Sequence, residues 1–412
     1  MLKGCIIVKK IKMLFCLFVS IFLVFILVSC KNIFNELEEE EHKHNEAVEG
    51  IIYNDLQIHS LELGNKYTGD ATYIKAGDID ILIDAGSRKN SATVIKEYVD
   101  KYCSDNKLEY VIATHAHQDH IAGFVGSKAG NERNGILYQY KVDTLIEFAL
   151  TDATSQLYED YLDAVDYAVS RGAKRLSAGD CYENLNGATR SFKLTENISM
   201  DILYNYYYFN DASDTSGGEN NYSVCLMFNY NDHHFMFTGD LEEEGEEKLV
   251  EYYDGSTKEK TLPKVDLFKA GHHGSKTSTN EKLLNLIKPD IVTVCACAGS
   301  TEYTADYKNV FPTQEFITRV AKYTDQVYVT SYFDEVEKTF KPLNGAIIVS
   351  CDGNAVAVAA TNNTIKLKDQ KWFNEMVYVD SSNRICPKKG SEDFYTQASS
   401  NVTSVVRRVW PS

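Results

Sequence analysis

The sequence has no excess of positive charge. Its 412 residues contain 42 Lys and Arg against 59 Asp and Glu, which gives a formal net charge of −17. When the four lysines of residues 1–29 are set aside, 38 basic and 59 acidic residues remain, and the net charge is near −21. A field of this sign repels polyanions. Large nucleic acids are therefore disfavoured as substrates, although a metal pair can overcome the global field at a local site.

The sequence also lacks an even set of cysteines. Ten cysteines are present, and seven remain when Cys5, Cys16 and Cys30 are set aside. Seven cysteines cannot pair completely within one chain, so no disulfide framework is implied. Cys295 and Cys297 lie in an apolar, strand-like run, and we expect them to be small buried side chains.

The first 30 residues differ from the rest of the chain. Four lysines precede an uncharged apolar run from Met13 to Val28, which is followed by Ser29 and Cys30. This pattern predicts a lipoprotein-type signal peptide over residues 1–29, with lipid attached to the Cys30 thiol after cleavage. A retained anchor helix is the alternative. Both place the remaining chain outside the cytoplasmic membrane of a bacterium, and the acidic segment 30–50 is predicted to be a solvated tether.

Four side chains that can bind metals are crowded into six positions. His115, His117, Asp119 and His120 follow the apolar, strand-like run from Leu108 to Ala113. Imidazole and carboxylate groups are ligands that Zn²⁺ and similar cations prefer. In extended or loop backbone, the two rings of an H-x-H step point to the same side. The cluster therefore predicts a metal site, with Asp119 and His120 facing a second ion nearby.

The order of elements along the chain predicts the fold class. Residues 71–76 and 79–84 alternate about a Gly-Asp turn and read as a hairpin, and helical spacing follows over residues 91–103. Strand-like and helix-like segments continue to alternate as far as about residue 360. This alternation predicts a layered α/β architecture. Residues 361–412 show no clear periodicity, and we treat them as an accessory C-terminal extension.

Two further short segments follow predicted strands. One is Thr238-Gly239-Asp240, and the other is Gly271-His272-His273-Gly274-Ser275. A Gly-Asp pair alone is more often a turn than a ligand. Because all three segments follow strands, they can converge at one edge of a sheet sandwich.

Together the three segments resemble the metallo-β-lactamase superfamily over roughly residues 51–360. The resemblance implies a four-layer αββα sandwich with two divalent cations at the sheet edge, Zn²⁺ first and Mn²⁺ as the alternative. It implies that His115 and His117 bind the first ion, that Asp119, His120 and His272 bind the second, and that Asp240 bridges the two.

A closer resemblance is to the hydrolase domain of ComEC-type DNA-uptake proteins and its stand-alone relatives. Residues 220–223, 237–241, 271–278 and 344–347 look like signatures of that subgroup in the right order. The ComEC-type proteins carry a multi-span channel beside this domain, and this chain has none. A role in DNA import therefore does not transfer automatically, and the net charge argues against it.

One departure concerns the first ion. Many members of the superfamily carry a further histidine between the first cluster and the bridging aspartate, but no histidine occurs from Ile121 to Asp232. Asn220, Asn221, Asp214 or water are the candidates to complete the site, unless the first ion binds weakly. His233 and His234 begin their strand too far from Asp240 to do so.

The chemistry that needs these residues is metal-assisted hydrolysis. Two cations lower the pKa of a bridging water, hold it as hydroxide and neutralise charge on a phosphoryl or acyl oxygen. Asp119 is expected to ligate and to orient that hydroxide, and His273 to act as general acid or as a support. Asn221, Ser275 and Lys276 are expected to bind substrate, because hydroxyl and ammonium donors suit phosphate oxygens. A helix N-cap is the alternative use of the serine-rich stretch.

The sequence therefore predicts a membrane-anchored metal-dependent hydrolase of a phosphate ester or phosphodiester. A small molecule or a component of the cell envelope is the expected substrate. Hydrolysis of a carbonyl compound, such as a lactone, thioester or β-lactam, is the first alternative, because the same hydroxide attacks carbonyl carbon. A non-catalytic lipoprotein that keeps a partial metal site as a binding module is the second.

Overall fold

The structure is a computed structural model, and it describes residues 48–129, 132–255, 261–386 and 402–411. Cys30, the predicted signal peptide and nearly all of the predicted tether lie outside these residues. Among the described residues, no helix is long and apolar enough to cross a membrane.

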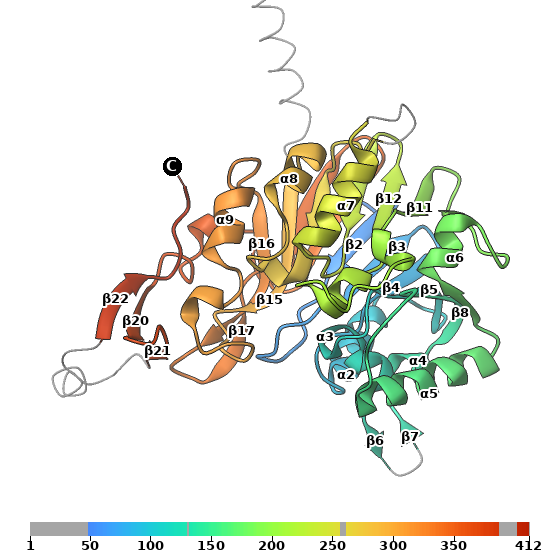
Figure 1. Cartoon of the computed structure of the whole chain (residues 1–412), viewed down its shortest axis with the longest axis horizontal. Coiled ribbons are helices and arrows are strands. Elements are labelled where there is room, and N and C mark those ends of the chain that lie inside the picture. Colours follow the sequence, from blue (N-terminus) through green and yellow to red (C-terminus); the bar gives the residue numbers. More distant parts are fainter. Residues whose placement is uncertain (1–47, 130–131, 256–260, 387–401, 412) are drawn as a thin grey trace, which may run out of the picture. The chain divides into compact units, whose positions relative to one another are not determined.

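Two large sheets dominate the fold (Figure 1). The first sheet has the order β1-β19-β18-β2-β3-β4-β5-β8-β9. Its strands are β1 (Val48–Glu49), β2 (Leu56–Ser60), β3 (Thr72–Ala76), β4 (Ile79–Ile83), β5 (Lys107–Ala113), β8 (Lys141–Glu147), β9 (Lys174–Ser177), β18 (Ile347–Cys351) and β19 (Val356–Ala360). The predicted hairpin is present as β3 and β4, which pair antiparallel from Thr72 opposite Ile83 to Ala76 opposite Ile79.

The second sheet has the order β10-β11-β12-β13-β14-β15-β16-β17. Its strands are β10 (Ser191–Lys193), β11 (Ile198–Ile202), β12 (Leu226–Tyr230), β13 (His233–Phe237), β14 (Leu267–Lys269), β15 (Ile291–Ala298), β16 (Val327–Asp334) and β17 (Thr339–Pro342). The two sheets meet where Ser60 Oγ in β2 donates to Thr293 Oγ1 in β15 at 3.1 Å.

Strands of the second sheet are buried on both faces. In β12, Leu226 and Phe228 join the largest core, whereas Met227 between them packs in a second cluster with Leu249 and Leu283. Successive side chains of a strand point to opposite faces, so a strand covered on both sides is a continuous apolar run. The predicted α/β sandwich is therefore confirmed.

Helices lie outside the two sheets (Figure 1). The helices α7, α8 and α9 pack in succession along the second sheet, and α2 to α5 contact one another beside the first. The helices are α2 (Ser91–Val99), α3 (Gln118–Val125), α4 (Ile136–Gln139), α5 (Gln156–Ser170), α6 (Ala178–Glu183), α7 (Glu243–Tyr253), α8 (Glu281–Ile287) and α9 (Gln314–Val320).

The described part of the chain after Ala360, which showed no clear periodicity, contains three strands. Strands β20 (Met376–Asp380), β21 (Ile385–Cys386) and β22 (Val402–Val406) form a separate three-stranded sheet. Arg408 follows this sheet, is buried, and donates to the backbone carbonyls of Tyr307, Val310 and Pro312. The C-terminal segment therefore fastens the loop that precedes α9.

Candidate metal centre

Strand ends bring the three predicted segments together. His115 and His117 follow β5, Asp240 follows β13, and the double histidine follows β14, which lies parallel to β13 in the same sheet. The carboxyl ends of parallel strands meet at one sheet edge, where loops carry functional groups. Gly239 has a φ of 55°, and a Cβ on it would lie 2.8 Å from Ser223 Oγ, so this turn requires glycine.

Four buried side chains form the tightest cluster. Ligand atoms of Asp119, His120, Asp240 and His273 all lie within 4.8 Å of one another. His120 Nε2 lies 3.1 Å from Asp240 Oδ2, and His273 Nε2 lies 3.2 Å from Asp119 Oδ2 and 3.3 Å from Asp240 Oδ2. His120 is held from behind by Asp84, whose Oδ2 lies 2.7 Å from Nδ1. Such support by a carboxylate is typical of metal-binding histidines.

The structure places the two adjacent histidines differently from what their sequence-based roles suggest, and those roles stay predictions. His273, predicted as general acid or support, is fully buried in the cluster, and its Nδ1 lies 3.0 Å from Asp70 Oδ1. His272, predicted as the last ligand, instead places Nδ1 2.9 Å from Glu242 Oε1 and Nε2 4.0 Å from Asp240 Oδ2. Both residues have positive φ, 44° and 55°. This tight left-handed turn places the His273 ring in the cluster and the His272 ring beside Glu242.

The predicted ligands of the first ion lie beside the cluster. His115 Nε2 and His117 Nδ1 are 3.1 Å apart, and the rings of His115 and His120 have centroids 4.1 Å apart. Burial, together with His120 and His117, lowers the pKa of His115 well below its usual value, so this imidazole is neutral. A neutral imidazole is the form that binds metal ions.

The donor set fits a divalent cation. Within the described residues, His120 Nε2, Asp240 Oδ1 and Asn220 Oδ1 are buried atoms without a hydrogen-bond partner. Buried polar atoms are nearly always paired, so unpaired nitrogen and oxygen atoms that lie this close together fit a site for a cation. Imidazole nitrogen and carboxylate oxygen together are the donors that Zn²⁺ and Mn²⁺ accept.

Charges inside the cluster depend on one another. Burial alone would raise the pKa of Asp240, but His120, His273 and His272 lower it well below its usual value. Burial alone would lower the pKa of His120, but Asp240 and Asp84 raise it well above the usual value. A cation in the site would take over this neutralising role from the histidines.

Lys269 adds a buried positive charge beneath the cluster. Its ammonium contacts Asp70 Oδ2 and lies 3.8 Å from Asp240 Oδ1. Burial alone would lower the pKa of Lys269, but Asp70 and Asp240 outweigh that effect and raise it. Lys269 could not be recognised from the sequence, because one lysine at the end of an apolar strand has no distinctive pattern.

A cavity of about 520 Å³ opens onto the cluster. It is lined by Arg88, His117, Gln118, Asp119, Asn220, His272, Glu302 and Tyr303. The Tyr303 hydroxyl donates to Asp119 Oδ2, and the Arg88 guanidinium pairs with Glu302. Arg88, Glu302 and Tyr303 were missed from the sequence, since each is an isolated residue in a loop.

The three predicted substrate-binding residues do not line this cavity. Asn221 is fully buried, where its Oδ1 accepts from the Glu242 backbone NH and its Nδ2 donates to Thr215. Ser275 Oγ pairs with Thr277 Oγ1, and the Lys276 ammonium donates to Asn309 on the surface. The polar side chains that do line the cavity include those of Arg88, Gln118 and Tyr303.

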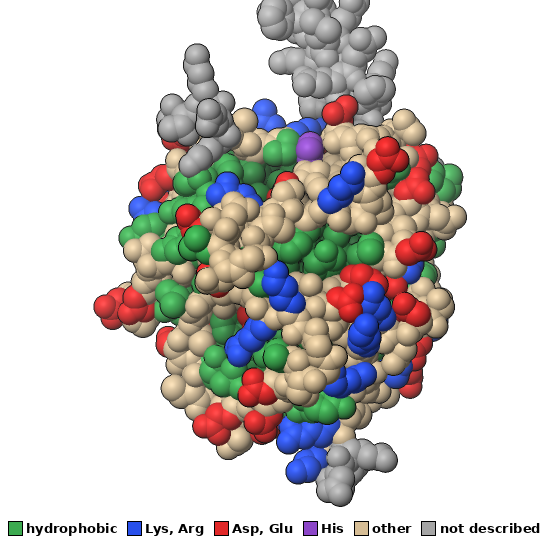
Figure 2. Space-filling model, turned by 90° about the vertical axis from the view of Figure 1, so that its right-hand side faces the viewer, with side chains coloured by type: hydrophobic (Ala, Val, Ile, Leu, Met, Phe, Trp, Pro, Cys, Tyr) green, Lys and Arg blue, Asp and Glu red, His purple; other side chains and the backbone are tan. Residues whose placement is uncertain are grey.

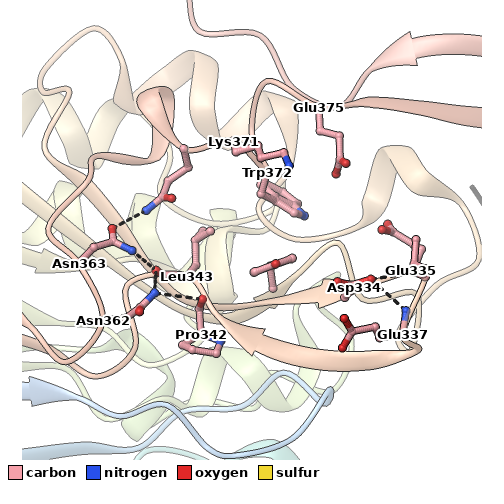
Figure 3. A pocket seen from close by; sticks show the side chains of 13 residues that line it. Asp334, Glu335, Glu337, Pro342, Leu343, Asn362, Asn363, Lys371, Trp372 and Glu375 are labelled. Carbon is pink, nitrogen blue, oxygen red and sulfur yellow. Dashed lines mark hydrogen bonds between the residues drawn. The ribbon is translucent and has the colours of Figure 1, made fainter.

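A second cavity, of about 370 Å³, shares no residue with the cluster (Figure 3). Its amide side chains are already used: Asn362 and Asn363 both donate to the Leu343 carbonyl, as the dashed lines indicate. Its carboxylates Glu335 and Glu375 pair with Arg407. These groups therefore serve the attachment of the C-terminal segment.

Comparison with known proteins identifies the domain. Residues 64–129 and 214–298 match the model of the metallo-beta-lactamase superfamily, and they contain every residue of the four-membered cluster. The chain contains a metallo-β-lactamase domain. This domain has the fold of metal-dependent hydrolases, and its clustered ligands indicate a divalent metal.

Two curated relatives extend this assignment. "Recombination protein 2" of Haemophilus influenzae is 29% identical over 122 residues, which are 30% of this chain and 14% of that protein. "ComE operon protein 3" of Bacillus subtilis is 25% identical over 221 residues, 53% of this chain and 24% of that protein. The predicted ComEC-like relationship is confirmed, and the chain spans at most about a quarter of the length of these relatives.

Solved structures show distant likeness. The metallo-β-lactamase fold protein YhfI from Bacillus subtilis aligns with a TM-score of 0.34 and 12% identity, over 58% of this chain and 85% of YhfI. A probable metal-dependent hydrolase from Staphylococcus aureus aligns with a TM-score of 0.31 and 13% identity, over 76% of this chain and 100% of that structure.

Proposed function

We propose that the metallo-β-lactamase domain hydrolyses a phosphate ester or phosphodiester, with two divalent cations as cofactors. The observation that carries this proposal is the convergence of Asp119, His120, Asp240 and His273 beside a cavity that Asp119 lines. These four residues would hold one ion, and His115 and His117 a second, with Asp240 shared. The cations, when bound, activate water and neutralise charge that develops on the substrate.

Side chains of the cavity wall support the substrate class. The Arg88 guanidinium and the Tyr303 hydroxyl are hydrogen-bond donors at the cavity, and such donors suit the anionic oxygens of a phosphate. In the structure, Arg88 pairs with Glu302 and Tyr303 donates to Asp119. A bound ion would compete for these carboxylates, and a bound substrate would compete for the two donors. Asp119 touches both the cluster and the cavity, so it can orient the attacking water.

His272 takes the acid role that the sequence assigned to His273. His273 is fully buried and does not line the cavity, whereas His272 does. Glu242 accepts a hydrogen bond from Nδ1 of His272, so only the doubly protonated ring carries a proton on Nε2 that can pass to a leaving oxygen. The carboxylate behind the ring stabilises this doubly protonated form and fixes the ring orientation for the transfer.

The expected partners follow from charge. Figure 2 shows acidic side chains interspersed with separate groups of Lys and Arg on the face that it presents, with no continuous basic track. A net charge of −17 weakens binding of long polyanions. A small or cell-envelope phosphate compound is therefore the proposed substrate class, and the proposed location is outside the cytoplasmic membrane, with lipid on Cys30.

Domain boundaries complete the proposal. We assign residues 51–360 to the hydrolase domain, because β18 and β19 complete the first sheet at Ala360. The end of the predicted tether, β1 (Val48–Glu49), joins the same sheet by pairing with β19. Residues 361–412 are assigned to an accessory extension, whose described part carries the separate three-stranded sheet.

Metal analysis and three substrates test the activity. Protein loaded with Zn²⁺ or Mn²⁺ is expected to contain near two ions per chain by mass spectrometry and to hydrolyse bis(p-nitrophenyl) phosphate. A chromogenic cephalosporin and a lactone serve as carbonyl substrates. Activity on the carbonyl substrates alone contradicts the phosphoester assignment, and a protein that binds no metal supports the non-catalytic module instead.

A further inference from the structure

The two proposed ions have unequal sets of protein ligands. Asp119, His120, Asp240 and His273 surround one position, whereas His115 and His117 share only Asp240 with it. No histidine lies between Ile121 and Asp232 to complete the poorer position. A side chain of another type must supply the ligand, or water must do so.

The structure distinguishes the three side chains that the sequence left open. Asp214 is exposed and does not line the cavity. Asn221 lies in the interior, with its amide oxygen and nitrogen both engaged. Asn220 lines the cavity together with His117, is 7% exposed, and its Oδ1 has no hydrogen-bond partner.

The backbone around Asn220 is tied to the two histidines. Glu219 Oε1 accepts a 2.9 Å hydrogen bond from the backbone NH of Ala116, the residue between His115 and His117. Ser223 Oγ lies 3.4 Å from His115 Nδ1. The segment that carries Asn220 therefore lies directly against the histidine pair.

The orientation of the Asn220 amide is fixed by Glu242. Asn220 Nδ2 lies 3.0 Å from Glu242 Oε1, and an ionised carboxylate can only accept a hydrogen bond. The NH₂ group must therefore face Glu242, and the carbonyl oxygen must point away from it. The same Glu242 oxygen lies 2.9 Å from His272 Nδ1, so one carboxylate orients two groups of the cavity wall.

We propose that Asn220 Oδ1 is the ligand that completes the first ion site, in place of the missing histidine, and that this site accepts Mn²⁺ more readily than an all-histidine site would. The proposal rests on the two-ion hydrolase proposed above. An amide oxygen is a harder and weaker ligand for Zn²⁺ than imidazole, and oxygen ligands suit Mn²⁺. The first ion is therefore held more weakly than the second.

Stepwise metal titration of the metal-free full chain tests this ligand. Zn²⁺ binding is measured by competition with a chromophoric chelator, and Mn²⁺ binding by the loss of the free-ion signal in electron paramagnetic resonance. Wild type is expected to bind two Zn²⁺ ions with unequal affinity. Asn220→Ala should weaken the weaker step by roughly 10-fold or more and leave the tighter step unchanged.

Asn220→His is the gain-of-affinity variant. It should strengthen the weaker Zn²⁺ step by about 10-fold or more and lower the preference of that site for Mn²⁺ relative to Zn²⁺. The matched control is Asn285→Ala, an exposed asparagine of α8 outside the cavity. If Asn220→Ala does not fold by circular dichroism, Asn220→His and Asn220→Asp decide the question.

The outcomes separate this inference from the proposed function. Two Zn²⁺ ions in wild type with both steps unchanged in Asn220→Ala and in Asn220→His overturn the ligand role and leave the hydrolase standing. A single ion in wild type whose affinity is unaffected by Asn220→Ala also overturns it. Wild type that binds no metal overturns the proposed function itself.

Discussion

His273 Nε2 lies 3.2 Å from Asp119 Oδ2, whereas the ring of the preceding residue, His272, is held by Glu242 at the cavity wall. Two adjacent histidines in one turn therefore have different environments. One is enclosed by carboxylates in the cluster, and the other is 19% exposed beside the cavity. This division of roles leads to the first prediction.

His273→Ala is expected to weaken metal binding, whereas His272→Ala is expected to lower turnover. Loss of His273 should reduce metal affinity by roughly 10-fold to 100-fold, because it removes a nitrogen donor from the cluster. The His272→Ala variant should retain the tighter ion but have a lower kcat. The loss of kcat should be larger for esters with a poor leaving group, because such a group depends most on protonation by a general acid. Metal content and a series of aryl phosphates measure both. Equal metal loss in the two variants contradicts the division of roles.

Tyr303→Phe is expected to lower turnover without removing metal. The substitution deletes the hydroxyl that donates to Asp119 and keeps the ring, whose centroid lies 5.6 Å from that of Phe311. Loss of a hydrogen-bond partner of a proposed metal ligand typically lowers activity by about 10-fold to 100-fold. Tyr323→Phe is the control, because the Tyr323 hydroxyl donates to Asn285 Oδ1 at an exposed position. If Tyr303→Phe has the same kcat as wild type, the Tyr303 hydroxyl has no role in the mechanism.

Lys269→Met is expected to destabilise the metal-free protein. The ammonium is the buried cation that contacts Asp70 and lies near Asp240, so its removal leaves buried carboxylates with less compensation. Breaking a buried ion pair by removing one partner costs about 3–5 kcal/mol. Urea unfolding of metal-free protein measures this cost, and added Zn²⁺ should recover part of it. Lys282→Met, at an exposed pair with Glu247, should leave the free energy of unfolding unchanged.

Much of the fold could be predicted because its signals are local and repeated. The runs that became β12 to β15 are apolar on both faces, and each ligand segment directly follows a strand, so the convergence at one edge follows from topology. Burial of Cys295 and Cys297 is likewise confirmed, and every cysteine among the described residues is free.

The remaining features of the site and of the C-terminal segment depend on backbone and loop geometry, which produces no periodic pattern in the sequence. A positive φ at His272 and His273 decides which ring enters the cluster. Positive φ is uncommon in residues other than glycine, so the sequence does not predict this conformation. Arg88 and Tyr303 reach the cavity from separate loops, and each is a single residue of ordinary type. Strand β22 lies in a segment of weak alternation, and it pairs with β20 far away in the sequence.

His233 and His234 offer a test of pH dependence away from the metal centre. They lie at the start of β13, and they are not part of the clusters of candidate ligands found among the described residues. The hydrogen bond from His233 to Asp266, at 2.9 Å, raises the pKa of His233. Its contribution to stability is then complete below pH 6.5, the value in the unfolded chain, and is lost as the pH rises through the raised pKa.

The neighbouring His234 should show the opposite slope, because burial lowers its pKa. Its contribution is complete above pH 6.5 and is lost as the pH falls through the lowered pKa, where the unfolded chain binds the proton and the folded chain does not. Urea unfolding of wild type, His233→Gln and His234→Gln from pH 5 to 9 measures both. The difference from wild type should shrink toward high pH for His233→Gln and toward low pH for His234→Gln. Two differences that change in the same direction would mean that Asp266 does not hold a charged His233, because the hydrogen bond to Asp266 is the largest cause of the raised pKa of His233.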